Sequence, residues 1–198
     1  MAEHGRVIEI TDPPFIQRLF GSPSWAWLWL IVRLYVGYTW LTSGLGKVGN
    51  PAWVQTGAAL KGFWERAVAV PEPPARPAIA FDWYRAFIQA LLDGGHYTWF
   101  AKLIVAGELL VGIALILGAF VGIAAFFGAF MNWNFMMAGT ASINPVLFTL
   151  SIFLILAWKT AGWWGLDRWL LPLLGTPWRP GRVFATKSET ASAAGHTS

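Results

Sequence analysis

Residues 103–158 read LIVAGELLVGIALILGAFVGIAAFFGAFMNWNFMMAGTASINPVLFTLSIFLILAW, and Glu108 is the only charged side chain in these 56 residues. An earlier apolar stretch, residues 25–46 (WAWLWLIVRLYVGYTWLTSGLG), also holds a single charge, Arg33. Charges within so much apolar chain belong to membrane segments or a very dry core, where they pair or line a functional cavity. We therefore predict a buried Arg33–Glu108 ion pair. Such a pair either locks helices together or forms part of a site, and the sequence leaves both open.

The composition is typical of an integral membrane protein. Hydrophobic residues make up 56% of the 198-residue chain, charged residues only 12%, and 14 residues are Trp. A soluble domain of this length needs more charge to cover its surface. The net charge of +4 fits anionic lipid better than nucleic acid, because the chain has no basic run with interleaved aromatic residues. We expect a lipid bilayer as a partner and no nucleic acid.

The chain has no Cys and only three His. Without thiols, disulfides, iron–sulfur clusters and thioether-attached haem are excluded. His4 and His196 lie in the polar ends and His96 stands just before an apolar stretch, so we expect neither intramembrane haem nor a His-based metal site. Redox chemistry would therefore require a diffusible cofactor or one held by a partner protein.

Four stretches are apolar enough to form membrane spans, each of which needs about 20 residues. They are residues 25–46, 97–117, 120–139 and 144–161. The run from 97 to 139 is too long for one crossing, and we place its break at Gly118-Ala119, although no polar residue marks this turn. Asn144 followed by Pro145 predicts the start of the last helix, as N-cap and first helical residue. The expected fold class is all-α, an integral-membrane four-helix bundle.

The chain divides into a polar, proline-broken N-terminal segment (1–23), a membrane domain (24–175) and a polar tail expected to be disordered (176–198). Within the membrane domain, the insert 47–96 departs from the apolar composition. Its apolar spacing predicts two short amphipathic helices, which are separated by the proline-rich segment PEPPARP at 71–77.

Basic residues predict the orientation in the membrane. Four spans place both termini on one side, which carries seven of these residues: Arg6, Arg18, Lys159, Arg168, Arg179, Arg182 and Lys187. The insert carries five: Lys47, Lys61, Arg66, Arg76 and Arg85. The excess favours cytoplasmic termini and an extracytoplasmic insert.

Three polar residues fall at similar depths on separate spans. At about 1.5 Å per residue, Arg33, Glu108 and Asn132 lie about 20, 16 and 12 Å below the surface from which the insert emerges. Each shares its helix face with small residues, which allow close approach of helices in membranes. The face of Arg33 also carries Gly37, Trp40, Gly44 and Lys47. We expect these faces to point inward, with Lys47 at the insert-side mouth above Arg33, either as part of a positive path or as a helix-end lysine reaching toward water.

Four pieces of the chain, in this order, resemble the DoxX/DoxD family of four-helix bacterial membrane proteins: RLYVGYTWLTSGLGKVGNP, GELLVGIALILG, MNWNFMMAGTASINP and WWGLDRWLLP. The resemblance covers residues 27–174. Eight residues fall where the family pattern has them: Arg33, Gly37, Gly44, Lys47, Pro51, Glu108, Gly112 and Gly118. The chain departs from the pattern after Gly118, where relatives often carry Arg and this chain has Ala119-Phe120.

The resemblance implies a quinone-linked function. The family takes its name from the membrane subunit of a thiosulfate:quinone oxidoreductase, which oxidises thiosulfate to tetrathionate and reduces quinone. The cofactor implied is a diffusible quinone, and a second redox protein or subunit is the implied partner, because this chain has no fused soluble redox domain. A homo-oligomer is also compatible with the pattern. Many relatives have no established activity.

In this hypothesis Glu108 and Arg33 are the catalytic residues. Arg33 and Lys47 would attract an anionic substrate and neutralise negative charge that develops on the quinone. Glu108 would relay protons, Asn132 would donate a hydrogen bond, and Trp40 would form part of the apolar wall. The rival hypothesis is a non-catalytic membrane scaffold that recruits soluble redox or stress-defence enzymes; a small transporter is a third option, with little room for alternating access.

Overall fold

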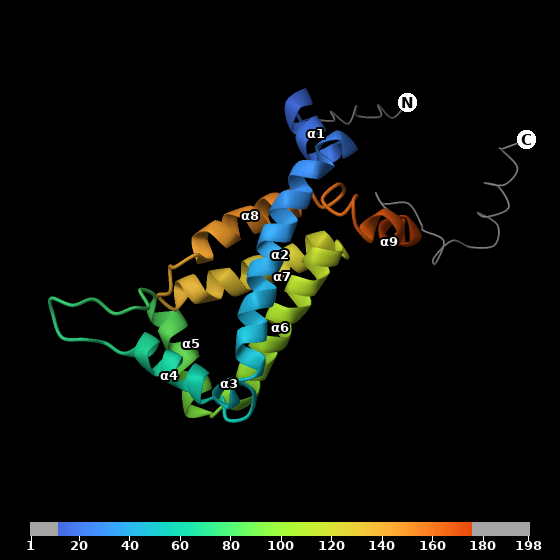
Figure 1. Cartoon of the computed structure of the whole chain (residues 1–198). Coiled ribbons are helices and arrows are strands. Elements are labelled where there is room, and N and C mark those ends of the chain that lie inside the picture. Colours follow the sequence, from blue (N-terminus) through green and yellow to red (C-terminus); the bar gives the residue numbers. More distant parts are fainter. Residues whose placement is uncertain (1–11, 176–198) are drawn as a thin grey trace, which may run out of the picture.

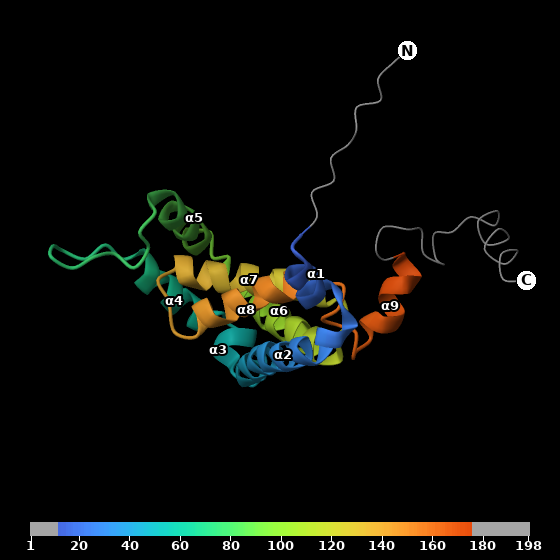
Figure 2. The same ribbon diagram turned by 90° about the horizontal axis from the view of Figure 1, so that it is seen from above.

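The computed structural model describes residues 12–175, and this part of the chain is helical with no strand. Four helices form its body: α2 (Ala26–Val48), α6 (Tyr97–Leu117), α7 (Val121–Met137) and α8 (Asn144–Leu156). Helix α2 packs most closely against α6, and α7 against α8 (Figure 1). Seen from above, these two pairs lie on opposite sides of the bundle (Figure 2). The all-α fold class is confirmed.

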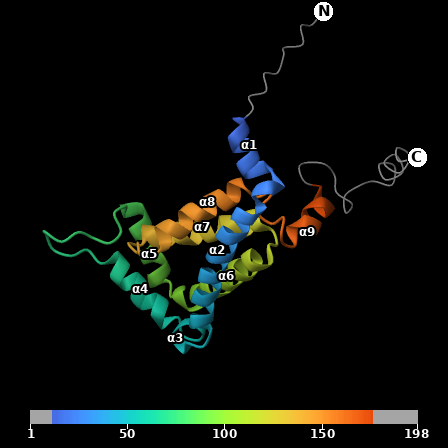
Figure 3. The same ribbon diagram turned by 45° about the horizontal axis from the view of Figure 1, so that its top comes forward.

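Short helices lie at the two ends of the bundle. One end holds α1 (Pro14–Gly21), the 3-10 turn η1 (Pro23–Trp25) and α9 (Asp167–Leu174). The opposite end holds the insert helices α3 (Pro51–Val54), α4 (Ala58–Val68) and α5 (Asp82–Asp93) (Figure 3). The insert therefore has the two predicted amphipathic helices, α4 and α5. A separate turn, α3, precedes them because Gly57 breaks the first segment with a φ of 72°.

The N-terminal prediction is corrected in its described part. We expected residues 1–23 to be a loose segment broken by prolines, but Pro14 begins α1, since proline at the first helical position has the required φ. Leu19 and Phe20 pack against the bundle core, and the carbonyl of Leu19 accepts a hydrogen bond from Trp29 Nε1 at 2.9 Å. Residues 1–11 and the predicted disordered tail, 176–198, lie outside the described residues.

The predicted break between the second and third apolar segments is confirmed. Helix α6 ends at Leu117, and Gly118 follows with a φ of 69°, which favours glycine because it has no Cβ. Phe120 has a φ of 48°, and α7 begins at the next residue. The last long helix differs from the prediction: Asn144 is its first helical residue and not its N-cap, and it ends at Leu156, short of residue 161.

By length and composition, α6 is long and apolar enough to cross a membrane, and among residues 12–175 it is the only helix that is. Helices α7 and α8 are apolar but shorter, at 17 and 13 residues. Helix α2 has 23 residues but is more polar, with Arg33, Lys47 and several hydroxyl side chains. The four predicted spans therefore stay a prediction.

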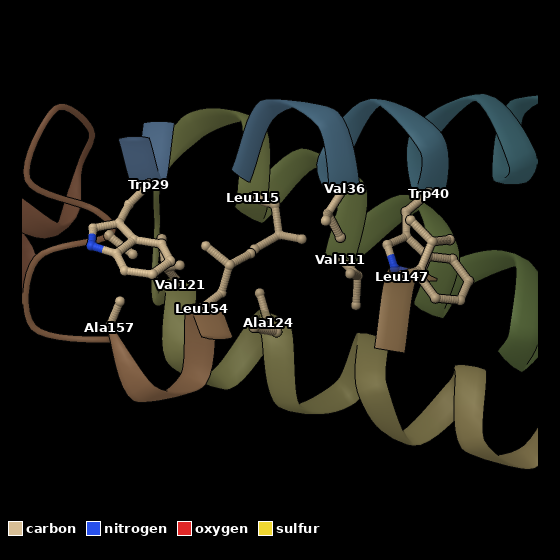
Figure 4. Packing of buried hydrophobic residues seen from close by; sticks show 12 residues of the cluster. Trp29, Val36, Trp40, Val111, Leu115, Val121, Ala124, Leu147, Leu154 and Ala157 are labelled. Atoms are coloured by element: carbon tan, nitrogen blue, oxygen red, sulfur yellow. The ribbon is translucent and has the colours of Figure 1, made fainter. Parts of the chain in front are cut away.

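Glycines set the close contact between α2 and α6. A Cβ added at Gly112 would lie 2.6 Å from the backbone nitrogen of Leu41, and one added at Gly44 would lie 2.8 Å from Leu109 Cδ2. Between these contacts and the far end of α2, the core is filled by large side chains. Figure 4 shows Val36, Leu115 and Leu154 meeting at its centre, with Trp29 and Trp40 at either side. The glycine contacts fix which residues of α2 face which residues of α6.

Gly112→Ala should therefore destabilise the protein by about 1–3 kcal/mol, because the new methyl group meets backbone and cannot be accommodated by rotamer changes. Gly46→Ala is the matched control: Gly46 lies in α2 with no atom within 4 Å of its Cβ position. The control should be neutral or stabilising by about 0.5–1 kcal/mol. Thermal unfolding in detergent measures both. Equal melting temperatures for the two variants would contradict the proposed helix contact.

Candidate functional site

Glu108 forms a buried ion pair with Lys47, near the insert end of the bundle. Lys47 Nζ lies 2.9 Å from Glu108 Oε1 and 2.7 Å from Oε2. It also donates to Ser43 Oγ at 2.7 Å and lies 5.2 Å from the ring centroid of Trp53. The Glu108 side chain is 1% exposed and that of Lys47 is 20% exposed. Lys47 therefore stands between the carboxylate and the surface of the insert end.

The predicted Arg33–Glu108 pair is wrong. The glycine contacts place Lys47 level with Glu108, whereas Arg33 lies level with Gly118, ten residues further along α6. The depth estimate failed because it started both helices at one surface. The first turns of α6 extend past the end of α2 and pack against α3 and α4. The expected positive path is also absent from the described residues, since Arg33 lies near the opposite end and Lys47 is paired.

Arg33 packs against two segments of the chain, the α6–α7 turn and the segment before α9. Its side chain is buried, and Nη2 donates to the backbone carbonyl of Trp164 at 3.2 Å. Nη1 packs against Gly118 and Gly165, where a Cβ on either glycine would collide with the guanidinium. Nε and Nη1 have no hydrogen-bond partner among the described residues. Arg33 thus fills the space between the α6–α7 turn and the segment before α9.

Asp167 also contacts the α6–α7 turn, through hydrogen bonds to its backbone. Its carboxylate accepts two hydrogen bonds, one from the backbone nitrogen of Phe120 at 2.6 Å and one from that of Val121 at 2.9 Å. These are unpaired N–H groups at the start of α7, so Asp167 acts as its cap from a distant part of the chain. Burial raises the pKa of Asp167, while the two N–H groups and the charge of Arg33 act to lower it. Backbone bonds add to the connection: the Asp167 nitrogen donates to the Gly118 carbonyl at 2.8 Å.

A cluster of polar atoms lies in the interior of the bundle. Trp40 of α2, Asn132 of α7 and Ser151 of α8 are 3%, 0% and 0% exposed. Gly128 brings them together: a Cβ there would lie 3.1 Å from Trp40 Nε1 and 3.7 Å from Ser151 Oγ, and Asn132 is one helical turn away. The indole nitrogen, both amide atoms and the hydroxyl have no partner among the described residues. We call Trp40, Asn132 and Ser151 the polar cluster.

The polar cluster neighbours Glu108. Met131 Sδ would lie 3.2 Å from a Cβ at Gly107, so Asn132 and Glu108 lie within about one helical turn of each other along the adjacent, antiparallel helices. The predicted common depth is wrong for Arg33 and stays a prediction for Asn132 and Glu108. Buried groups that lack partners are costly, at about 1–3 kcal/mol each, which favours a bound molecule or ordered water at this position.

A long apolar groove of about 850 Å³ opens between α6 and α7. Its lining includes Gly107, Val111 and Met131, beside Glu108 and the polar cluster, and aromatic side chains of α5 and α7 such as Phe87 and Phe127. Val111 lines the groove and also borders the polar cluster, because its Cγ1 lies 3.3 Å from the Cβ position of Gly128. The groove therefore runs along the polar cluster with one layer of side chains between them.

Helix α5 covers the insert end of the groove. Tyr84 is buried and its hydroxyl donates to the Asn134 carbonyl of α7 at 3.1 Å. Burial raises the pKa of Tyr84 to about 12, so this hydroxyl keeps its proton and remains a donor at neutral pH. The insert is thus attached to the bundle at the groove.

Ser151 and Asp167 were missed from the sequence. Ser151 is a hydroxyl in an apolar helix, where serine commonly bonds its own backbone; its position opposite Gly128 follows from packing alone. Asp167 had a usable signal, because it is an acidic residue in a segment that is apolar and aromatic apart from the adjacent Arg168 (WWGLDRWLLP). Within residues 12–175, no group of three or more His, Asp or Glu side chains is placed to hold a metal ion.

The ion-pair partner is tested by a double-mutant cycle. Lys47→Met should destabilise the protein by up to about 3–5 kcal/mol, because Glu108 is left buried without a counter-charge. Combined with Glu108→Gln, the loss should be much smaller than the sum of the single losses, whereas Arg33→Met and Glu108→Gln should add. Lys61→Met, which breaks the exposed pair with Glu65, is the control and should change stability by less than about 1 kcal/mol. Coupling of Glu108 to Arg33 instead of Lys47 would contradict this geometry.

Asp167→Asn should lower stability by about 1–2 kcal/mol, because an amide has one acceptor oxygen for two backbone N–H groups. Asp93→Asn, at an exposed residue that bonds only the Gln89 side chain, is the control and should have little effect. Thermal unfolding in detergent is the measurement. Similar melting temperatures for both variants would show that Asp167 does not hold the α6–α7 turn.

No family model, curated protein or solved structure matches this chain. The resemblance to the DoxX/DoxD family therefore stays a prediction, and the functional assignment depends on the geometry of Glu108, the polar cluster and the groove.

Proposed function

We propose that the protein is the membrane subunit of a quinone-linked oxidoreductase, a multi-pass protein of the bacterial cell membrane with cytoplasmic termini. The observation that carries this proposal is the polar cluster: three buried side chains without partners among the described residues, within about one helical turn of a buried carboxylate and along an apolar groove. The DoxX/DoxD resemblance agrees with it. Thiosulfate as the electron donor, and a second redox protein that delivers electrons, are further parts of the proposal that derive from that resemblance.

The outer surface supports a location in the membrane. Large apolar side chains face outward along the long helices, among them Tyr38 of α2, Leu110 of α6 and Ile123 of α7, which are 65%, 68% and 60% exposed. Extended apolar surfaces of this kind are unstable in water and mark contact with lipid or protein. Exposed tryptophans lie at both ends, Trp164 and Trp169 at one and Trp83 and Trp99 at the other. Tryptophan is enriched at the two membrane interfaces.

The residues present fit a quinone. Trp40 Nε1 can only donate a hydrogen bond, and the Asn132 amide and Ser151 hydroxyl can donate as well, which suits a carbonyl oxygen. The groove suits the isoprenoid tail, since its walls are apolar and its volume lies within the range of ligand pockets. A bound quinone would accept two electrons and two protons. For the polar cluster to orient its ring, the side chains that separate the cluster from the groove, Val111 among them, would have to move aside. The apolar walls would exclude water.

Glu108 is the group placed to hold a proton at this site. The route from its carboxylate to water passes Lys47, the partly exposed member of the pair. A displacement of Lys47 toward Trp53 would open Glu108 to the insert side. We therefore propose that protons exchange with the insert side of the membrane, and that Arg33 and Asp167 serve the structure of the opposite end and not the chemistry.

The ion pair also supports the scaffold hypothesis. Lys47 contacts both oxygens of Glu108, so the pair is complete without a ligand and serves equally well to hold α2 against α6. In that case the insert would be the recruiting surface for soluble enzymes. The two functions differ in the polar cluster, which a scaffold does not need.

Asn132→Leu separates the two functions. Decylubiquinone should raise the melting temperature of the wild-type protein in detergent, because a ligand that binds only the folded state stabilises it. The variant should fold with an equal or higher melting temperature without quinone, since an unpaired buried amide is removed. Its response to decylubiquinone should fall strongly. Thr149→Val, at an exposed hydroxyl of α8 outside the cluster, is the control and should respond like the wild type.

Two results would contradict the quinone proposal. If Asn132→Leu responds to decylubiquinone as the wild type does, the polar cluster is not the binding site. If the wild type shows no response, and solvent extraction of the purified protein yields no quinone, the scaffold hypothesis is favoured.

A further inference from the structure

A second cavity, of about 260 Å³, lies at the end of the bundle opposite the insert. Three parts of the chain meet there: Gly21 and Pro23 from the N-terminal side, Lys159 from the segment after α8, and Arg168 from α9. Two of these residues are basic and come from different elements, so a positively charged cavity is built by the fold.

Each of the two cations forms a cation–π contact with a tryptophan ring. Lys159 Nζ lies 5.7 Å from the ring centroid of Trp158, and Arg168 Cζ lies 5.5 Å from that of Trp163. Among the described residues neither cation forms an ion pair. These contacts favour the observed positions of the charges, although both side chains are exposed to solvent.

The carboxylate of Asp167 forms no ion pair with either cation among the described residues, although its negative charge offsets part of theirs. Asp167 also lines the cavity, but both of its oxygens accept backbone N–H groups from Phe120 and Val121. The Thr160 hydroxyl is likewise directed away, toward the Phe20 carbonyl at 3.0 Å. Among the described residues the cavity thus has two cations and one carboxylate, a net positive charge, and its lining also includes the apolar Leu171.

We infer that this cavity binds the phosphate group of an anionic membrane lipid. A guanidinium forms paired hydrogen bonds with phosphate oxygens, and the adjacent ammonium adds a point charge. The exposed Trp163 and Trp164 place the cavity at the depth of lipid headgroups, provided that the protein lies in a membrane as proposed above. The cytoplasmic leaflet, which this end would face, is rich in anionic lipid. The inference depends on that location and not on quinone binding.

Titration of the detergent-purified protein with phosphatidylglycerol, phosphatidylcholine or inorganic phosphate tests the inference, with melting temperature as the readout. Phosphatidylglycerol should stabilise the wild type, and the other two should not. In Lys159→Gln/Arg168→Gln the lipid response should be lost. Arg66→Gln/Lys102→Gln is the control; it removes the same charge from exposed residues outside the cavity and should keep the response.

The single variant Lys159→Gln keeps Arg168 and provides a test should the double variant fail to fold. Its half-maximal phosphatidylglycerol concentration should rise about tenfold, as expected for loss of one charge-assisted hydrogen bond.

Equal stabilisation by inorganic phosphate would overturn the assignment to lipid, as would equal stabilisation by phosphatidylcholine. An unchanged lipid response in the Lys159 and Arg168 variants would overturn the site. The decylubiquinone response of the same variants, which should stay at the wild-type level, shows whether the quinone site is intact.

Discussion

The close contact of α2 with α6 determines where the buried charges of these two helices, Arg33 and Glu108, lie. Gly44 and Gly112 let the two helix backbones approach, and a side chain at Gly112 would meet the backbone of Leu41. Because the contact extends along most of both helices, it fixes their relative register. Lys47 is thereby placed on Glu108, and Arg33 is placed beneath the α6–α7 turn. A shift of one helical turn would leave both acidic and basic groups buried without partners.

The two ends of the bundle use their charges differently. At the insert end, a complete ion pair lies next to the polar cluster and the groove, which together have the features of a binding site. At the opposite end, Arg33 and Asp167 are engaged with backbone groups of two turns, so that the α6–α7 connection, the segment before α9 and the start of α7 are joined. Buried polar atoms without a partner among the described residues occur in both places: in the polar cluster at the first, and at Nε and Nη1 of Arg33 at the second. At the second end, Asp167 and Nη2 of Arg33 bond the backbone of the chain itself.

Much of the fold could be predicted from the sequence, because helix positions depend on local patterns. The apolar runs, the break at Gly118 and the amphipathic insert are all of this kind. Burial of Arg33, Trp40, Glu108 and Asn132 was also predictable, from their place on faces rich in small residues, and all four are buried. The ion-pair partner of Glu108 was not predictable. It depends on the register between two helices, and the estimate assumed that α2 ends where α6 begins. Ser151 and Asp167 acquire their roles only through contacts between distant segments.

The central claim is that the polar cluster binds a quinone oxygen, and the indole N–H of Trp40 reports on it directly. The chain has 14 Trp, so Trp40→Phe is needed to assign its ¹⁵N-indole resonance in the detergent-solubilised protein. If the account is right, saturating decylubiquinone moves this resonance downfield, as an unpaired N–H gains an acceptor, and the shift is lost in Asn132→Leu. A Trp40 resonance that stays in place at saturating quinone would contradict the account.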